Sequence, residues 1–155
     1  MDFNFRLMNQ KEADEIAYNW KYDGIYSFYD ETNDEDDLIE LIDPNKRGNN
    51  FYSCYFDNEL IGHYSIEITK DIIGELGLGL KPCFTGKGIG LIYVNAVMDH
   101  IFVTSGIKKF SLIVAKFNKR AITVYKRAGF IVDKEFIQKT NGGEYEFLKM
   151  VKNRK

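Results

Sequence analysis

LGLKPCFTGKGIG, residues 78–90, joins a predicted strand to a predicted helix. The strand covers about 74–81 and stops before Pro82, and the helix runs from about Ile89 to Ser105, before Gly106. Glycines let the backbone turn sharply and bring several N–H groups close to a ligand. The helix N-terminus behind them has unpaired donors and a partial positive charge, which favour an anion such as phosphate.

Two known phosphate-binding patterns do not fit this loop. A nucleoside-triphosphate loop needs GxxxxGK followed by Ser or Thr, whereas Lys87 precedes Gly88 here. A dinucleotide loop needs GxGxxG, and the position of its third glycine is occupied by Tyr93. The remaining pattern, xxGxG at a strand-to-helix turn, also allows a purely structural loop.

The hydrophobic pattern on either side of the loop predicts a single α/β domain over residues 1–155. Expected strands cover about 3–8, 50–56, 60–68, 74–81, 108–115, 130–137 and 144–151, and expected helices about 10–20, 34–42, 89–105 and 118–129. The order is β-α-α-β-β-β-α-β-α-β-β, with turns at 57–59 and 141–143 and a helix stop at Asp43-Pro44. The helix crossing from the fourth to the fifth strand makes these two strands parallel. The prediction is therefore a mixed sheet with a central parallel pair and helices on both faces.

A second motif lies at residues 118–130, NKRAITVYKRAGF, which has the spacing N-x2-A-x3-Y-x3-G-F. Together with LGLKPCFTGKGIG at 78–90, this motif strongly resembles the GCN5-related N-acetyltransferase (GNAT) superfamily. The order of the two motifs and of the expected elements is similar to that of the family from residue 3 to residue 151. The resemblance implies an enzyme, an acyltransferase that uses acetyl-CoA (coenzyme A).

The resemblance also implies where the cofactor binds. The pyrophosphate would lie on the loop amides, and the pantetheine arm would pair with the preceding strand like an added β-strand. Asn118 resembles the asparagine that contacts the cofactor. The implied cofactor-binding residues are Leu78, Gly79, Leu80, Thr85, Gly86, Lys87, Gly88, Ile89, Gly90 and Asn118. Thr85 departs from the family, which usually has Gln or Arg there, so the chain lacks a long polar side chain at that position.

For catalysis, the resemblance implies direct attack by the amine without an acyl-enzyme, so no cysteine nucleophile is needed. Tyr125 corresponds to the family's tyrosine that faces the thioester sulfur, and we expect it to act as general acid or hydrogen-bond donor to the thiolate. A main-chain N–H near Leu80 is the expected oxyanion donor. Glu75 is the first candidate for the base and His63 the second. Ile113 stands where one branch of the family has a glutamate, which argues against that branch's mechanism.

Charge is divided unevenly along the chain. Residues 1–80 hold 18 acidic and 6 basic residues, and residues 81–155 hold 5 acidic and 15 basic residues. An anion held by the second half and a cation held by the first would suit this division. Basic residues near the expected phosphate site are Lys87, Lys116, Lys119 and Arg120. The expected acceptor wall is aromatic, with Trp20, Tyr22, Tyr26, Phe28 and Tyr29, and eight acids follow over 30–43. This combination favours a small amine, a polyamine-like cation or a basic peptide end.

Other classes of protein fit the composition poorly. Two cysteines, Cys54 and Cys83, predict neither a disulfide framework nor a metal site. We expect a cytoplasmic protein with no membrane or nucleic-acid partner, because there is no long apolar run and the net charge is −2. A homodimer is compatible with the sequence. Two alternatives stay open: a non-catalytic sensor that binds acyl-CoA, and an enzyme that acetylates protein N-termini.

Overall fold

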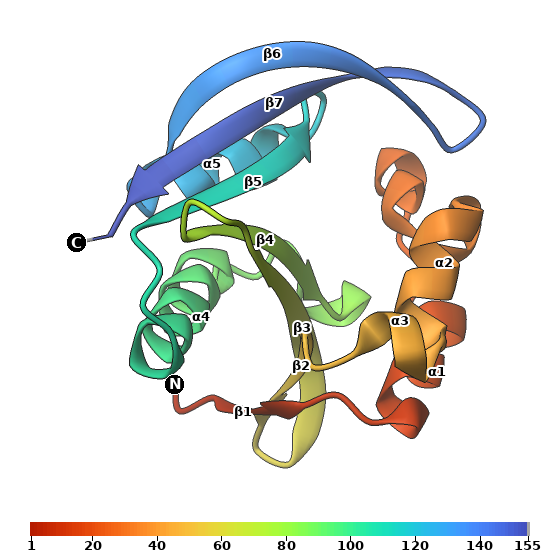
Figure 1. The fold of residues 1–155 in the computed structure, drawn as a ribbon. Coiled ribbons are helices and arrows are strands. Elements are labelled where there is room, and N and C mark those ends of the chain that lie inside the picture. The colour runs from red at the N-terminus through yellow and green to blue at the C-terminus, as the bar shows by residue number, and fades with distance from the viewer. Residues whose placement is uncertain (155) are drawn as a thin grey trace.

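A computed structural model describes residues 1–154, so the last residue of the predicted domain, Lys155, lies outside it. Its seven strands form one mixed sheet with the order β1-β2-β3-β4-β5-β7-β6 (Figure 1). The strands are β1 (Asn4–Leu7), β2 (Phe51–Phe56), β3 (Glu59–Ile68), β4 (Ile73–Leu80), β5 (Lys109–Ala115), β6 (Ile131–Thr140) and β7 (Gly143–Asn153). Among the strand pairs within residues 1–154, only β4 and β5 are parallel. The predicted fold class and the predicted parallel pair are therefore confirmed.

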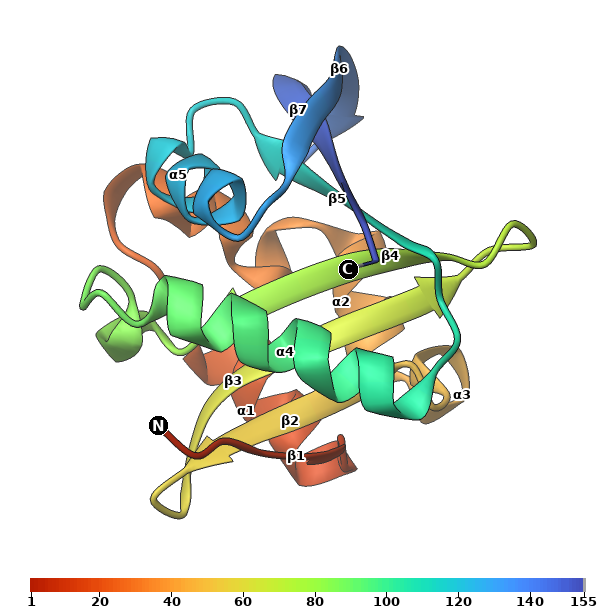
Figure 2. The same ribbon diagram turned by 90° about the vertical axis from the view of Figure 1, so that its left-hand side faces the viewer.

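Helices cover both faces of this sheet, as predicted. They are α1 (Gln10–Asn19), α2 (Glu35–Ile42), α3 (Pro44–Arg47), α4 (Gly90–Thr104) and α5 (Lys119–Arg127), with 3₁₀ helices η1 (Gly24–Tyr29), η2 (Glu31–Asn33) and η3 (Pro82–Phe84). Helix α4 crosses one face of strands β2 to β4, and α1 and α2 lie behind the same strands (Figure 2). No helix within residues 1–154 has the length and apolar character that a membrane span requires.

Each face of the sheet has its own hydrophobic core. On the α4 side, Val97 of α4 and Phe110 of β5 are completely buried in the larger cluster. On the opposite side, Ile16 and Trp20 pack with Leu41 of α2. The two cores hold α4 and α1 at fixed positions on either side of β4, which is the strand that enters the site.

The predicted helix stop is confirmed and the predicted turns are corrected. Helix α2 ends at Ile42, and Pro44 begins α3 as its first residue, where a missing N–H costs nothing. The expected three-residue turns are two-residue turns, because Asp57 and Asn58 both have positive φ, as do Asn141 and Gly142. The last two strands are accordingly longer than predicted. Three of the aromatic residues expected in the acceptor wall, Tyr26, Phe28 and Tyr29, lie in the 3₁₀ helix η1, where the sequence predicted no helix or strand.

Strands β4 and β5 stay paired over a short distance only. Ile73–Glu75 pairs with Lys109–Ser111, and the register ends there although both strands continue. Beyond this point β4 pairs only with β3, and β5 only with β7. The sheet therefore opens along the C-terminal halves of two parallel strands.

Glycines on β4 make room for side chains of β3. A Cβ atom on Gly79 would lie far inside contact distance of the His63 ring, and one on Gly77 would collide with the Ser65 hydroxyl. The His63 ring in turn packs against Trp20, with ring centroids 5.7 Å apart. Gly79 therefore allows His63 to lie over β4 on the α1 side of the sheet.

We predict that Gly79→Ala lowers the free energy of unfolding by about 1–3 kcal/mol, the usual cost of overpacking. The added methyl must displace the His63 ring, so most of this cost should disappear when Gly79→Ala is made in a His63→Ala background. Urea denaturation of the two single variants and the double variant measures this coupling. Gly106→Ala is the control, because a Cβ there meets no atom within 4 Å. An equal cost of Gly79→Ala in both backgrounds would refute the steric account.

Candidate active site

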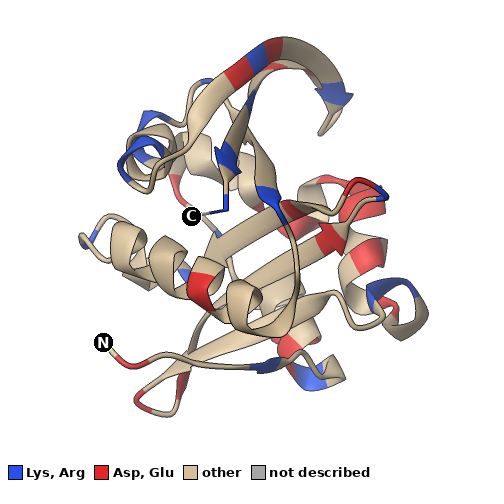
Figure 3. Ribbon diagram, turned by 60° about the vertical axis from the view of Figure 1, so that its left-hand side comes forward, with Lys and Arg blue, Asp and Glu red and all other residues tan. Residues whose placement is uncertain are grey.

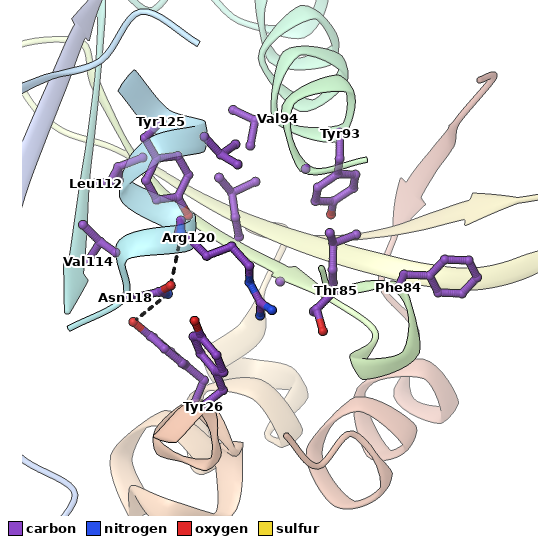
Figure 4. Close-up of a pocket in the computed structure, with 18 of the residues that line it drawn as sticks. Tyr26, Phe84, Thr85, Tyr93, Val94, Leu112, Val114, Asn118, Arg120 and Tyr125 are labelled. Carbon is purple, nitrogen blue, oxygen red and sulfur yellow. Dashed lines mark hydrogen bonds between the residues drawn. The ribbon is translucent and has the colours of Figure 1, made fainter. Parts of the chain in front are cut away.

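One pocket of about 490 Å³ fills the opening between β4 and β5. Its walls come from both halves of the sequence, since η1, β3, β4, η3, α4, β5 and α5 all contribute residues. Figure 4 shows side chains from α4, β5 and α5 converging on this space, with Tyr26 approaching from the other side. The pocket is therefore a product of the strand divergence, and the strands supply its floor.

The main chain of β4 faces this opening at alternate residues. Lys81 donates its N–H to the Ile61 carbonyl of β3 at 2.7 Å, and the carbonyl of Ile72 accepts from Lys108 on the β5 side at 3.0 Å. Alternation along the strand then directs the main-chain N–H and C=O of Leu78 and Leu80 into the opening. The Leu80 carbonyl is used, because the Tyr22 hydroxyl donates to it at 2.6 Å.

The glycine loop has the shape that the sequence predicted. Gly86 and Gly88 have φ of 70° and 80°, a conformation that other residues rarely adopt. Helix α4 begins at Gly90, where a Cβ would lie 3.2 Å from Val124 of α5, so this glycine allows the two helices to approach closely. Thr85 and Lys87 are the loop's larger polar side chains; the Thr85 hydroxyl donates to the Pro82 carbonyl at 2.7 Å, and Lys87 is exposed.

Helix α5 positions two of the predicted residues. The Asn118 side chain accepts from the N–H of Ala121 at 3.1 Å and caps the helix. The Asn118 amide also donates to the Tyr29 hydroxyl at 3.1 Å, which ties η1 to α5 (Figure 4). Tyr125 lies two turns further along, and burial raises the pKa of its phenol above the ordinary value. Its hydroxyl therefore stays protonated and can donate a hydrogen bond.

The other end of the pocket is aromatic and acidic. Trp20, Tyr22, Tyr26 and Tyr29 line it together with Glu31. Burial raises the pKa of Glu31 to about 8, and the negative charges of three neighbouring acids, Asp37, Glu40 and Asp34, add to the effect. Sequence reasoning treated the acids over 30–43 as a group and did not single out Glu31. The only signal would have been its place directly after the aromatic segment.

His63 also lines this end. Burial lowers the pKa of its imidazole to about 4, so the ring is neutral at pH 7. A neutral ring can exchange hydrogen bonds with a ligand, but it is a weak proton acceptor.

Glu75 lies outside the pocket that Tyr125 lines. It is exposed, pairs with Glu67 on β3, and is absent from the pocket lining. It lies five positions before Leu80 on β4, a span of about 16 Å. The odd spacing directs its side chain to the face opposite that of Leu80, the α1 side on which His63 also lies, so its distance from Leu80 along the strand, and not its face, separates it from the pocket. This placement does not favour Glu75 as the base.

Most of the other predicted site residues line the same pocket. Those that line the pocket are Leu78, Gly79, Leu80, Thr85, Gly86, Gly88, Gly90, Asn118 and Tyr125. Lys87 and Ile89 do not line it, although Ile89 precedes α4 and its carbonyl accepts from Tyr93 at 2.9 Å. The predicted division of charge is visible in space: acidic segments gather around α2 and basic ones on α5 (Figure 3).

Comparison with known proteins shows the family of this chain. A sequence model described as "Acetyltransferase (GNAT) family" matches residues 13–130. The chain belongs to this family. The resemblance predicted from the two motifs is thus confirmed, and the family's enzyme class and cofactor, an acyltransferase with acetyl-CoA, are those predicted.

Individual relatives are similar over different lengths. A spermidine N(1)-acetyltransferase of Escherichia coli K12 is 33% identical over 63 residues, 41% of this chain and 34% of that enzyme. The match thus spans about a third of the enzyme's length. The crystal structure of a Vibrio cholerae spermidine N-acetyltransferase in complex with CoA and spermine superposes with a TM-score of 0.76. It is 20% identical, over 97% of this chain and 95% of that one, and so shows the shared fold.

The raised pKa of Glu31 predicts a stability that depends on pH. A carboxyl group whose pKa is higher in the folded state than in the unfolded state destabilises the fold as pH rises, here between about 4.5 and about 8. We predict that Glu31→Gln raises the Tm at pH 8.5 and leaves it nearly unchanged at pH 4.5. Relief of about 2 kcal/mol, from the burial of the charge and its repulsion by neighbouring acids, corresponds to roughly 4–8 °C for a domain of this size.

Thermal unfolding at the two pH values tests this, with Glu35→Gln as the matched control. Glu35 is an exposed acid of the same segment that does not line the pocket. A gain of stability that is the same at both pH values, or equal in the control, would contradict the role assigned to Glu31.

Proposed function

We propose that this protein transfers the acetyl group of acetyl-CoA to a primary amine of a small, polyamine-like cation. One observation carries the proposal: a single pocket joins a glycine loop and the free main chain of β4 to an aromatic end that holds Glu31. The first part suits a phosphate-bearing thioester and the second suits an ammonium group. Spermidine is the substrate named for the relative from Escherichia coli.

The residues of the donor end fit acetyl-CoA. Two glycines with positive φ leave the loop amides open, and a Cβ at Gly88 would meet nothing within 4 Å, so a diphosphate has room to approach. Leu78 and Leu80 offer main-chain groups along the opening, where a pantetheine arm can pair with them. Acetyl-CoA supplies an activated acyl group on a thiol leaving group.

The acceptor end must bind a cation and then remove a proton from it, because an alkylammonium has a pKa of about 10.4. Proton transfer to Glu31 is uphill by about 2.4 pKa units, or roughly 3 kcal/mol. Transfer to His63 would be uphill by about 6 units, or roughly 9 kcal/mol. Glu31 is therefore the better proton acceptor, directly or through water, and it replaces Glu75 in the proposal. Trp20 and Tyr22 offer aromatic surface to the rest of the cation.

Two groups serve the reacting centre. The N–H of Leu80 is directed into the opening while Tyr22 occupies the carbonyl of the same residue, so this N–H is available to a developing oxyanion. The Tyr125 hydroxyl stabilises the departing thiolate. Because its pKa is raised further above that of a thiol, it acts chiefly as a hydrogen-bond donor and transfers its proton only at a cost.

A panel of acceptors tests the proposed function. Release of free thiol from acetyl-CoA is followed with spermidine, spermine, a diamine, a monoamine and a peptide with a free N-terminus. We expect turnover to be highest with the polyamines, since Asp34, Asp37 and Glu40 extend the negative charge around Glu31. Preference for the peptide would favour the alternative of N-terminal acetylation. Binding of acetyl-CoA without thiol release from any amine would favour the non-catalytic sensor.

We predict that Tyr125→Phe lowers kcat by about 10- to 1,000-fold, the range for a lost acid or transition-state donor. The affinity for CoA should change little, because only one hydroxyl is removed. Stopped-flow turnover and calorimetric titration measure the two effects. Tyr18→Phe is the control, since Tyr18 is exposed and lies outside the pocket. Unchanged kcat in the Tyr125 variant would exclude this residue from the mechanism.

A further inference from the structure

The glycine loop has a cationic neighbour that does not belong to it. A Cβ on Gly86 would lie 3.2 Å from Nη1 of Arg120, so this guanidinium on α5 lies directly beside the loop. Arg120 lines the pocket, whereas Lys87, the lysine of the loop itself, does not. The full positive charge beside the loop amides therefore comes from α5.

The loop's own polar side chain does not take this position. The Thr85 hydroxyl donates to the Pro82 carbonyl, which closes the short helix η3. Thr85 is also too short to reach across a diphosphate. Arg120 extends from α5 into the space beside Thr85 (Figure 4), where it supplies the long cationic side chain that position 85 lacks.

Arg120 is held by an aromatic ring from the acceptor wall. Its Cζ atom lies 4.2 Å from the centroid of the Tyr26 ring in η1. Among residues 1–154, no carboxylate forms an ion pair with Arg120. A guanidinium stacked on a ring keeps its N–H donors free at its edge. The stack thus orients an uncompensated charge toward the loop.

We infer that Arg120 binds the diphosphate of coenzyme A over the glycine loop, and that Tyr26 is the residue that positions it. This inference rests on the proposed use of acetyl-CoA. It makes Tyr26 part of both ends of the pocket, because η1 belongs to the acceptor wall and Arg120 to the donor end. A guanidinium suits the task because it donates two parallel hydrogen bonds to phosphate oxygens.

Calorimetric titration with CoA and with dephospho-CoA, which keeps the diphosphate, tests the role of Arg120. Arg120→Gln should weaken binding of both by roughly 10- to 100-fold, the usual loss of a charge-assisted contact. Lys119→Gln is the matched control, since it removes an exposed charge next to Arg120 that does not line the pocket. With S-acetylpantetheine as donor, which has no phosphate, Arg120→Gln and wild type should have similar kcat/KM.

Two substitutions test the positioning role of Tyr26, one that keeps the aromatic ring and one that removes it. Tyr26→Phe keeps the ring face and should keep CoA affinity, whereas Tyr26→Leu should weaken it by about two- to fivefold. In an Arg120→Gln background, Tyr26→Leu should have no further effect on CoA binding. A general loss of packing would instead lower affinity in both backgrounds.

The outcomes separate this inference from the proposed function. If wild type binds no CoA, the proposed function fails. If wild type binds CoA and Arg120→Gln binds it equally well, only the inference is overturned. A loss with CoA that vanishes with dephospho-CoA would move Arg120 to the 3′-phosphate and would also overturn the assignment to the diphosphate.

Discussion

The early end of pairing between β4 and β5 is the constraint on which the site depends. Two parallel strands that stay together have all their main-chain groups paired; two that separate leave one row of N–H and C=O groups facing open space. Here the separation begins after Glu75 and Ser111, and the pocket occupies the space. The core on the α4 face contains buried residues of both strands, Leu76 of β4 and Leu112 of β5, and so fixes the strands on which this row lies.

The segment from Tyr22 to Asp34 connects the two ends of that pocket. Its contacts reach the donor half of the molecule at several places: the Tyr22 hydroxyl on the Leu80 carbonyl, the Tyr26 ring under Arg120 and the Tyr29 hydroxyl on Asn118. At its end Asp34 accepts from the Thr140 hydroxyl near the tip of the β6–β7 hairpin. An aromatic segment that folds alone would be poorly ordered; these contacts to remote elements give it one position.

Sequence reasoning succeeded where the determining interactions are local. The Asn118 cap, the glycine conformations at 86 and 88 and the position of Tyr125 on α5 follow from contacts within a few residues. It failed where distant segments meet. Neither motif predicts the stacking of Tyr26 on Arg120. Neither motif predicts the burial that raises the pKa of Glu31. Glu75 was the reverse case, since its distance from Leu80 along β4 could already be derived from the sequence.

The acidic end illustrates how local stability and function use the same residues differently. Glu35, Asp36 and Asp37 lie in the first turn of α2, where the helix dipole favours negative charge, and Asp34 caps that helix. These acids therefore stabilise the start of α2 whatever the protein binds. Glu31 lies one 3₁₀ turn earlier, outside the helix, and lines the pocket. Burial and the negative charges of its neighbours raise the pKa of its carboxyl, and the dipole of α2 does not offset this effect. In the proposed function, a cation bound at Glu31 would offset this charge and so link the pH dependence of the fold to occupancy of the acceptor end.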